Sequence, residues 1–185
     1  MRLTIILGSL TLLLISCSKE GDNPAVPSNQ PVVVFTSSFE SNGNSSLVGW
    51  QIIDTSRSNL ISFSRDIPQD GGSWSLMLRG TSFNGAGVRT FIVAPPLSSQ
   101  KKYFLTYSAK GTPGSDFCIS FVIWQSPIIS VVLSSAQYST WTNCVDTLFS
   151  GRSTSDTLEI TIAPPKGDST SYILLDNIKV VQTPQ

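Results

Sequence analysis

Histidine is absent from the 185 residues of this sequence, and its absence excludes several kinds of chemistry. Ser-His-Asp and Cys-His nucleophile systems, HExxH zinc sites and other histidine-ligated metal sites all need an imidazole. Charged residues are also scarce, at 13% of the chain against about 25% in typical globular domains. Lys plus Arg and Asp plus Glu number 12 each, so no bulk charge attracts nucleic acid or an anionic membrane.

Glutamate is rare as well, which limits the carboxylate chemistry that remains. A glycosidase needs two carboxyl groups about 5 to 9.5 Å apart. Glu20 lies in a proline-containing segment and Glu159 on an alternating strand, while the Asp residues fall mostly at turns, where their local hydrogen bonds favour them. No Gly-rich phosphate loop is present either. We therefore expect no enzyme, with glycan hydrolysis by an isolated carboxylate pair as the remaining catalytic alternative.

Residues 1–16 have the make-up of a signal peptide. Arg2 supplies a positive charge, and the apolar stretch that follows has about 13 residues, fewer than the roughly 20 of a membrane-spanning helix. The run Leu14-Ile15-Ser16-Cys17 resembles the lipobox of bacterial lipoproteins, whose cysteine receives diacylglycerol through its sulfur. The resemblance implies a lipid anchor, including palmitate, on Cys17. A plain secretory signal or a buried N-terminal strand is the alternative.

Residues 17–31 are predicted to be the lipidated cysteine and a flexible tether. The segment contains three prolines with Gly, Asn, Ser and Gln and almost nothing to bury. Ser18 resembles the residue that directs lipoproteins to the bacterial outer membrane, and Lys19-Glu20-Gly21-Asp22 resembles the charged signals of surface-exposed lipoproteins of the Bacteroidetes. We expect an outer-membrane lipoprotein of the cell envelope, facing either the periplasm or the cell surface.

Residues 32–185 are predicted to form one all-β domain. The apolar stretches are short, rich in β-branched and aromatic residues, and bounded by turn-forming residues. Residues 158–162 and 117–124 alternate in polarity, so each of these strands buries one face. The other predicted strands cover residues 32–36, 50–53, 60–64, 73–79, 88–93, 103–110, 128–133, 140–149 and 172–181. About ten short strands at this spacing indicate a sandwich or barrel.

Four local patterns, in chain order, carry a family resemblance. They are Ser38-Phe39-Glu40 with Gly49-Trp50, the run Gly72 to Leu78, the run Tyr103 to Lys110, and Leu175-Asp176-Asn177-Ile178-Lys179-Val180. Together they resemble jelly-roll modules of the galactose-binding-like superfamily, including carbohydrate-binding modules of the family 4, 9 and 22 type. The resemblance implies a jelly-roll β-sandwich whose first and last strands are neighbours. Members include sugar binders and adhesive modules, so the fold alone does not decide the function.

The same resemblance implies a structural calcium ion held by Glu40 and Asp176. Calcium takes six to eight hard oxygen ligands, so backbone carbonyls near Gly71 and Gly72 are expected to complete the shell. The alternative is that the two carboxylates only cap strand ends in solvent.

Sugar recognition needs an aromatic face and polar side chains that pair with hydroxyls. If the odd-numbered residues 103–109 face the core, the even-numbered ones project from the opposite face, where residues of the next strand join them. The candidate ligand-binding residues are therefore Phe104, Trp124, Thr106, Ser108, Lys110 and Ser120. The alternative is that loops or strands cover Phe104 and Trp124. Trp50, Trp74 and Trp141 are expected to pack in the core or in turns.

Once Cys17 is lipidated, only Cys118 and Cys144 remain. An exported domain meets an oxidising compartment, which favours a disulfide between them. That disulfide would close a loop of roughly 26 residues and stabilise the fold by about 3 kcal/mol. Two buried free thiols are the alternative.

The function that the sequence favours is a lipid-anchored, non-catalytic module that binds carbohydrate or another cell-surface ligand. The alternative is a structural or adhesive surface module that binds a protein partner. Neither the identity of the ligand nor the oligomeric state follows from the sequence.

Overall fold

The computed structural model describes residues 30–82, 85–93, 101–112, 115–123, 129–136, 139–148 and 157–184. Within these ranges the side chains of residues 101–102, 115–123, 129–136, 147–148 and 184 lie outside the described part. Within the described ranges, no helix combines the length and the apolar character needed to cross a membrane.

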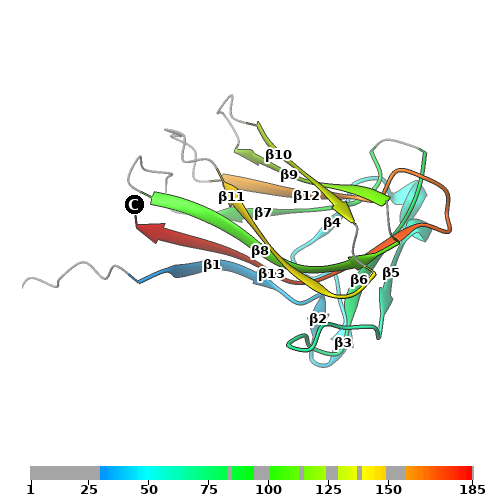
Figure 1. The fold of residues 1–185 in the computed structure, drawn as a ribbon, viewed down its shortest axis with the longest axis horizontal. Helices are drawn as coiled ribbons and strands as arrows, with labels where there is room; N and C mark the ends of the chain where they lie inside the picture. Colours follow the sequence, from blue (N-terminus) through cyan, green and yellow to red (C-terminus); the bar gives the residue numbers. More distant parts are fainter. Residues whose placement is uncertain are drawn as a thin grey trace, which may run out of the picture.

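Two antiparallel sheets make up the domain and form the two layers seen in Figure 1. The six-stranded sheet contains β11 (Thr142–Leu148), β8 (Lys101–Gly111), β13 (Tyr172–Pro184), β6 (Ser75–Arg79) and β5 (Ile61–Ser64) in this order, with β1 (Val32–Ser37) paired to β13. The five-stranded sheet contains β10 (Ile129–Ala136), β9 (Ser115–Ile123), β12 (Thr157–Ala163), β7 (Val88–Val93) and β4 (Gln51–Ile52). This is a jelly-roll β-sandwich, as the sequence predicts.

The predicted strands agree with those of the structure to within a few residues at each end. β1 lies beside β13, which confirms the expected pairing of the first and last strands. The sequence did not predict the short hairpin of β2 (Glu40–Ser41) and β3 (Asn44–Ser45), nor the 3-10 helix η1 (Thr55–Leu60). Elements of this length hold too few residues for a periodic pattern.

The core lies between the sheets and is built by alternation along the strands. On β8 the odd-numbered residues Tyr103, Leu105, Tyr107 and Ala109 are all buried, as predicted. On β12 they are faced by Leu158, Ile160 and Ile162. Burying each large apolar side chain contributes roughly 1.5–3 kcal/mol. Along β7 and β12 the alternate residues are partly or fully exposed, so these strands present their other side on the outer surface of the sandwich.

Trp50 closes the core near the start of the domain, which confirms its predicted role in packing. Its side chain is buried, and its ring contacts Phe39 at 5.3 Å and Phe35 at 6.1 Å between centroids. The indole Nε1–H donates a hydrogen bond of 2.9 Å to Ser37 Oγ. A buried indole N–H needs such an acceptor, so Ser37 joins β1 to the core.

Replacing Ser37 with Ala is expected to destabilise the domain by about 1 kcal/mol, because the Trp50 N–H then loses its acceptor. Urea denaturation followed by tryptophan fluorescence measures the change. Ser41→Ala, at an exposed position of β2, is the matched control and is expected to leave the midpoint unchanged. An equal midpoint for Ser37→Ala and Ser41→Ala would contradict this role of Ser37.

Candidate functional site

The two carboxylates predicted to bind calcium are far apart in the sequence, on β2 and β13, and close together in the structure. Glu40 lies on β2, and both of its carboxylate oxygens accept hydrogen bonds from Ser73 N, at 3.1 and 3.0 Å. Asp176 lies on β13, and its Oδ1 accepts from Asn177 N at 2.8 Å. The Asp176 side chain is fully buried, and its Oδ2 has no hydrogen-bond partner among the described residues. A buried carboxylate oxygen without a partner is costly, so it calls for a ligand or a proton.

The surroundings of Asp176 oppose its ionisation. Burial, together with the nearby carboxylates of Glu40 and Asp70, raises the pKa of its carboxyl to about 6, and backbone hydrogen bonds from Asn177 and Gly72 offset this rise only in part. A bound cation would neutralise both effects, because it stabilises the charged form of each carboxylate.

Gly71 and Gly72 make room for these carboxylates. A Cβ atom added at Gly71 would lie 2.6 Å from Asp176 Oδ2, and one at Gly72 would overlap Glu40 Oε1. The backbone of the loop thus touches both carboxylates directly, which agrees with the position expected for Gly71 and Gly72. Within the described residues, no cluster of three or more His, Cys, Asp or Glu side chains surrounds a metal position, so a cation would rely on backbone and water oxygens.

Gly72→Ala is expected to destabilise the domain by about 1–2 kcal/mol, because the new methyl displaces the Glu40 carboxylate and breaks its bonds to Ser73 N. Thermal unfolding with and without a chelator measures the effect. Ser41→Ala, at an exposed position of the same β2–β3 hairpin, serves as the control. An equal loss of stability in Ser41→Ala and Gly72→Ala would contradict the steric explanation.

The predicted ligand-binding residues do not form one surface, and this expectation was wrong. β8 belongs to the six-stranded sheet and β9 to the five-stranded sheet, although the two strands follow each other in the chain. Phe104, Thr106, Ser108 and Lys110 lie on the outward-facing side of β8, whereas Ser120 lies on β9, opposite Thr161 of β12. The chain crosses from one sheet to the other between β8 and β9, so the predicted residues belong to different layers of the sandwich. Trp124 lies outside the described residues.

Two of these residues already have polar partners. Lys110 Nζ forms an ion pair of 2.6 Å with Asp66 Oδ2, and Trp141 Nε1 donates to Asp66 Oδ1 at 2.8 Å. Burial of Asp66 would raise its pKa, but the bonds from Lys110 and Trp141 outweigh that effect and lower the pKa of its carboxyl. Ser108 is buried and donates to Asn143 Oδ1 at 2.8 Å. Trp141 therefore packs in a turn, and Lys110 is held in place by the protein itself.

Trp74 also has a structural environment. The Arg65 guanidinium lies 3.6 Å from the centre of its ring, and its Nε1 donates to Gly43 O at 3.2 Å. These contacts join the loop before β6 to the β2–β3 hairpin. Trp74 was expected to pack in the core or in a turn, and its contacts with Arg65 and Gly43 give it such a structural role.

The cysteine predictions fall partly outside the described residues. Cys144 on β11 is half-buried and packs against the core, and its Sγ lies 3.7 Å from Thr142 O. Cys118 lies on β9 in the other sheet, and its side chain is not among those described. The described residues contain no disulfide, so the Cys118–Cys144 pairing stays a prediction. Titration of thiols after denaturation tests it. Cys17 also lies outside the described residues.

The outer face of the five-stranded sheet carries a polar and aromatic group that the sequence patterns did not reveal. Phe91 on β7 is 39% exposed, and the Arg89 guanidinium lies 5.4 Å from the centre of its ring. Arg89 Nη1 lies 4.0 Å from Glu159 Oε1 on β12, and Thr161 Oγ1 donates to the same oxygen at 3.1 Å. Strand register places Gln51, Arg89 and Thr161 in one row and Phe91 and Glu159 in the next. We call these five residues the β7–β12 face.

Alternation within β7 contained the signal for this face. In Val88-Arg89-Thr90-Phe91-Ile92-Val93 the buried positions alternate with Arg89, Phe91 and Val93. Because alternate side chains of a strand point to the same face, the sequence of β7 alone predicts these three on one surface. Pairing with Glu159 required the register of β7 against β12, which a single sequence does not contain.

Comparisons with known proteins rest on the fold rather than on sequence. No protein-family model and no curated protein matches the sequence. The CBM22-1 xylan-binding domain from Paenibacillus barcinonensis Xyn10C superposes with a TM-score of 0.54 at 14% identity, over 83% of this chain and 96% of that one. TmCBM61, solved with β-1,4-galactotriose, gives a TM-score of 0.52 at 10% identity, over 71% and 86%.

The chain has the fold of these carbohydrate-binding jelly rolls. A cyclase from Fischerella sp. TAU shares the fold too, with a TM-score of 0.62 at 13% identity, over 84% of this chain and 98% of that one. Jelly rolls of this kind therefore include both binding modules and a catalyst, so the function of this jelly roll has to be argued from its own residues.

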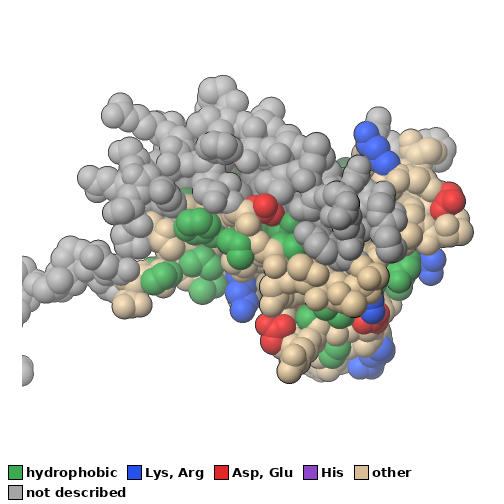
Figure 2. All heavy atoms as spheres, in the orientation of Figure 1, with side chains coloured by type: hydrophobic (Ala, Val, Ile, Leu, Met, Phe, Trp, Pro, Cys, Tyr) green, Lys and Arg blue, Asp and Glu red, His purple; other side chains and the backbone are tan. Residues whose placement is uncertain are grey.

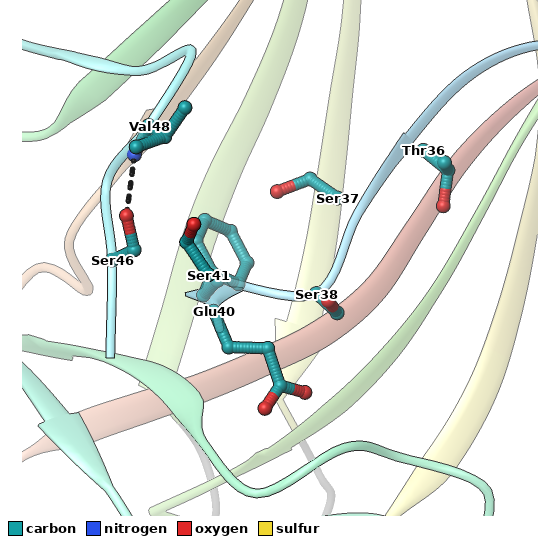
Figure 3. A pocket seen from close by; sticks show the side chains of 8 residues that line it. Thr36, Ser37, Ser38, Glu40, Ser41, Ser46 and Val48 are labelled. Atoms are coloured by element: carbon teal, nitrogen blue, oxygen red, sulfur yellow. Dashed lines mark hydrogen bonds between the residues drawn. The ribbon is translucent and has the colours of Figure 1, made fainter. Parts of the chain in front are cut away.

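Figure 3 shows a small hollow beside β1 and β2 of the jelly roll. Its volume is about 180 Å³, and hydroxyl groups dominate its lining: Thr36, Ser37, Ser38, Ser41 and Ser46. Ser46 Oγ accepts a hydrogen bond from Val48 N, and the Glu40 carboxylate points away from Val48 and Ser46. The carboxylate is directed to the Gly71–Gly72 loop, and Glu40 also lines the hollow.

Charged side chains are spread thinly over the described surface. In the view of Figure 2 the Lys, Arg, Asp and Glu side chains are scattered among polar and hydrophobic ones, with no large patch of one sign. On the face shown, a ligand would meet individual side chains rather than a field of one sign.

Proposed function

We propose that this chain is a non-catalytic module that binds a polysaccharide on its β7–β12 face. The observation that carries the proposal is the exposed Phe91 ring with Arg89 and Glu159 around it. A sugar ring has apolar C–H faces that pack on an aromatic ring, while its hydroxyls bond to charged and amide groups at the ring edge.

The polar groups of this face are suited to hydroxyls. Arg89 has guanidinium donors to spare, since its side chain is 39% exposed and its contact with Glu159 is long, at 4.0 Å. Glu159 is held by Thr161, so it offers an acceptor in a fixed position. Hydrogen bonds to charged groups contribute about 1.5–3 kcal/mol each, more than those between neutral groups.

The solved structures with this fold support a glycan as the ligand. One is described as a xylan-binding domain, and another was solved with β-1,4-galactotriose. A face with one exposed aromatic ring and a few polar side chains offers a shallow contact, so we expect binding to a chain surface, with modest affinity.

Affinity gel electrophoresis against soluble xylan and β-1,4-galactan tests the proposal. We expect at least one polysaccharide to retard the native domain, and incubation to release no new reducing ends. Unchanged migration in a broad panel of neutral and acidic polysaccharides would overturn the binding proposal, and release of reducing ends would overturn the non-catalytic part.

A structural calcium ion at Glu40 and Asp176 is the second part of the proposal. The buried, unpartnered Asp176 Oδ2 and the loop backbone against both carboxylates fit such an ion. Glu40 and Asp176 would hold it, with carbonyls of the Gly71–Gly72 loop, and it would fasten that loop and the β2–β3 hairpin to β13. Its role would be stability rather than contact with the glycan, because the β7–β12 face belongs to the other sheet.

A lipid anchor on Cys17 is the third part. Its support is the lipobox-like Leu14-Ile15-Ser16-Cys17 and the tether composition before β1. A module held at a membrane works at high local concentration, so a weak glycan contact is sufficient there. Labelling of bacterial cells with an alkyne-bearing palmitate should mark the wild type and not Cys17→Ala; equal labelling of both would overturn the anchor.

A further inference from the structure

A second hollow lies on the outer side of the six-stranded sheet, away from the β7–β12 face. Its volume is about 190 Å³, and its polar and apolar lining comes from three strands and one loop: Asp70, Thr106, Asn143, Val145, Asn177 and Lys179. Strand pairing puts Val145 opposite Thr106 and Asn143 opposite Ser108, with Lys179 on the other side of Thr106.

A bulge in β13 creates the hollow. The register against β8 shifts between Asp176 and Lys179, and Asn177 takes a left-handed conformation with φ 53. The bulge turns the Asn177 side chain to Asp70, whose Oδ1 accepts from Asn177 Nδ2 at 3.2 Å. This hydrogen bond fixes the side chains of Asp70, from the loop, and Asn177, from β13, at one end of the hollow.

At the other end, Ser108 fixes the Asn143 amide. Ser108 is buried, and its hydroxyl donates a hydrogen bond of 2.8 Å to Asn143 Oδ1. This bond leaves the Asn143 Nδ2 group as a donor, and Lys179 is exposed and makes no ion pair within the described residues. Asp70 and Asn177 Oδ1 offer acceptors, so donors and acceptors alternate around the hollow.

An apolar wall completes the arrangement. Val145 is 66% exposed beside the hollow, and Phe104 is half-exposed two residues from Thr106 on the same side of β8. One ammonium and one carboxylate balance each other, which suits a neutral ligand better than a phosphate or a uronate. The volume falls below the 300–1,000 Å³ typical of pockets for drug-sized ligands, so it suits one ring rather than a chain segment.

We propose that this hollow is a second sugar site, which takes a single neutral pyranose at a chain end or branch. The proposal extends the proposed function, since the class of ligand rests on it, but the residues are different. Two sites on different sheets of the sandwich would let one domain bridge two glycan chains.

Titration of isotope-labelled domain with galactose, glucose and xylose, followed by amide chemical shifts, tests the second site. We expect saturable shifts at Thr106, Asn143 and Lys179 with one of these sugars, at a dissociation constant on the order of 1 mM. Asn143→Ala combined with Lys179→Met should weaken this binding about tenfold or more. Val32→Thr, an exposed change on the edge strand β1, is the control and should leave it unchanged.

Phe91→Ala separates the two proposals, because it alters only the β7–β12 face. Shifts at Thr106, Asn143 and Lys179 that persist in Phe91→Ala support the second site whatever becomes of the first. Polysaccharide binding by the wild type without shifts at these three residues overturns the second site and leaves the proposed function intact. Absence of shifts with all three sugars overturns it as well.

Discussion

Asp176→Asn is expected to stabilise the calcium-free domain at neutral pH, by about 2–3 kcal/mol. The carboxylate is buried with one oxygen unpartnered, and burial together with Glu40 and Asp70 raises its pKa from 3.8 to about 6. A shift of this size corresponds to roughly 3 kcal/mol of cost for the ionised form. The neutral amide avoids the cost, so the thermal midpoint in chelator should rise by roughly 5–10 °C.

The same substitution should abolish the response to calcium. In the wild type, calcium at about 100 times its dissociation constant is expected to add about 2.7 kcal/mol. In Asp176→Asn a ligand of the ion is lost, so the midpoints with calcium and with chelator should coincide. Asp70→Asn is the control for the calcium response, because it removes an exposed charge near Asp176 and no proposed calcium ligand; its midpoint should still rise with calcium. A destabilised, still calcium-responsive Asp176→Asn protein would contradict the site.

The raised pKa of Asp176 also predicts how the stability of the calcium-free domain changes with pH. The folded state binds a proton at Asp176 up to a pKa of about 6, whereas an unfolded Asp releases it near 3.8. The contribution of Asp176 to the stability of the calcium-free wild type should therefore be highest below about pH 4, fall as the pH rises to about 6, and level off above it. Asp176→Asn should lack this fall.

Phe91→Ala and Arg89→Ala are each expected to weaken polysaccharide binding about tenfold to a hundredfold. Phe91 supplies the apolar surface for a sugar ring, and Arg89 supplies charged donors beside it. Arg89→Lys should recover only part of the loss, because an ammonium lacks the planar fork of a guanidinium. Isothermal titration calorimetry with the glycan that retards the native domain measures each affinity.

Stability has to be separated from binding in these variants. Both side chains are on the outer face of β7, so their loss should change the thermal midpoint little. Val48→Ala removes an exposed apolar side chain from the loop after β3 and should bind as the wild type does. Equal affinity of Phe91→Ala and Val48→Ala would contradict binding at the β7–β12 face.

Local patterns were enough to predict the strands and their buried sides. Alternation along residues 103–110 predicts Tyr103, Leu105 and Tyr107 in the core, and all three are buried. Each of these inferences depends only on neighbours in the chain, because the side chains of a strand alternate in direction.

The alternation within each strand could not predict which of the two sheets the strand joins. β8 and β9 are consecutive, and consecutive strands usually pair, so their outer residues were expected on one surface. In the jelly roll the chain passes to the other sheet at this point, and β8 pairs with β11 and β13 instead. The expected single surface is consequently replaced by two, the hollow near Thr106 and the β7–β12 face.

The remaining features of the candidate sites depend on contacts between residues that are far apart in the sequence. Glu40 and Asp176 were expected together only through a family resemblance, and the structure places both against the Gly71–Gly72 loop. The sequence does not reveal that Asp176 Oδ2 lacks a hydrogen-bond partner, because this depends on which donors the fold places near that oxygen. The same holds for Arg89, whose approach to Glu159 depends on the register of β7 against β12.

A crystal structure of the domain with the oligosaccharide that it binds most tightly tests the central claim most directly. We predict a sugar ring packed on Phe91, with hydroxyls bonded to Arg89 and Glu159. A ligand seated elsewhere on the sandwich, with Phe91 and Arg89 untouched, would contradict it.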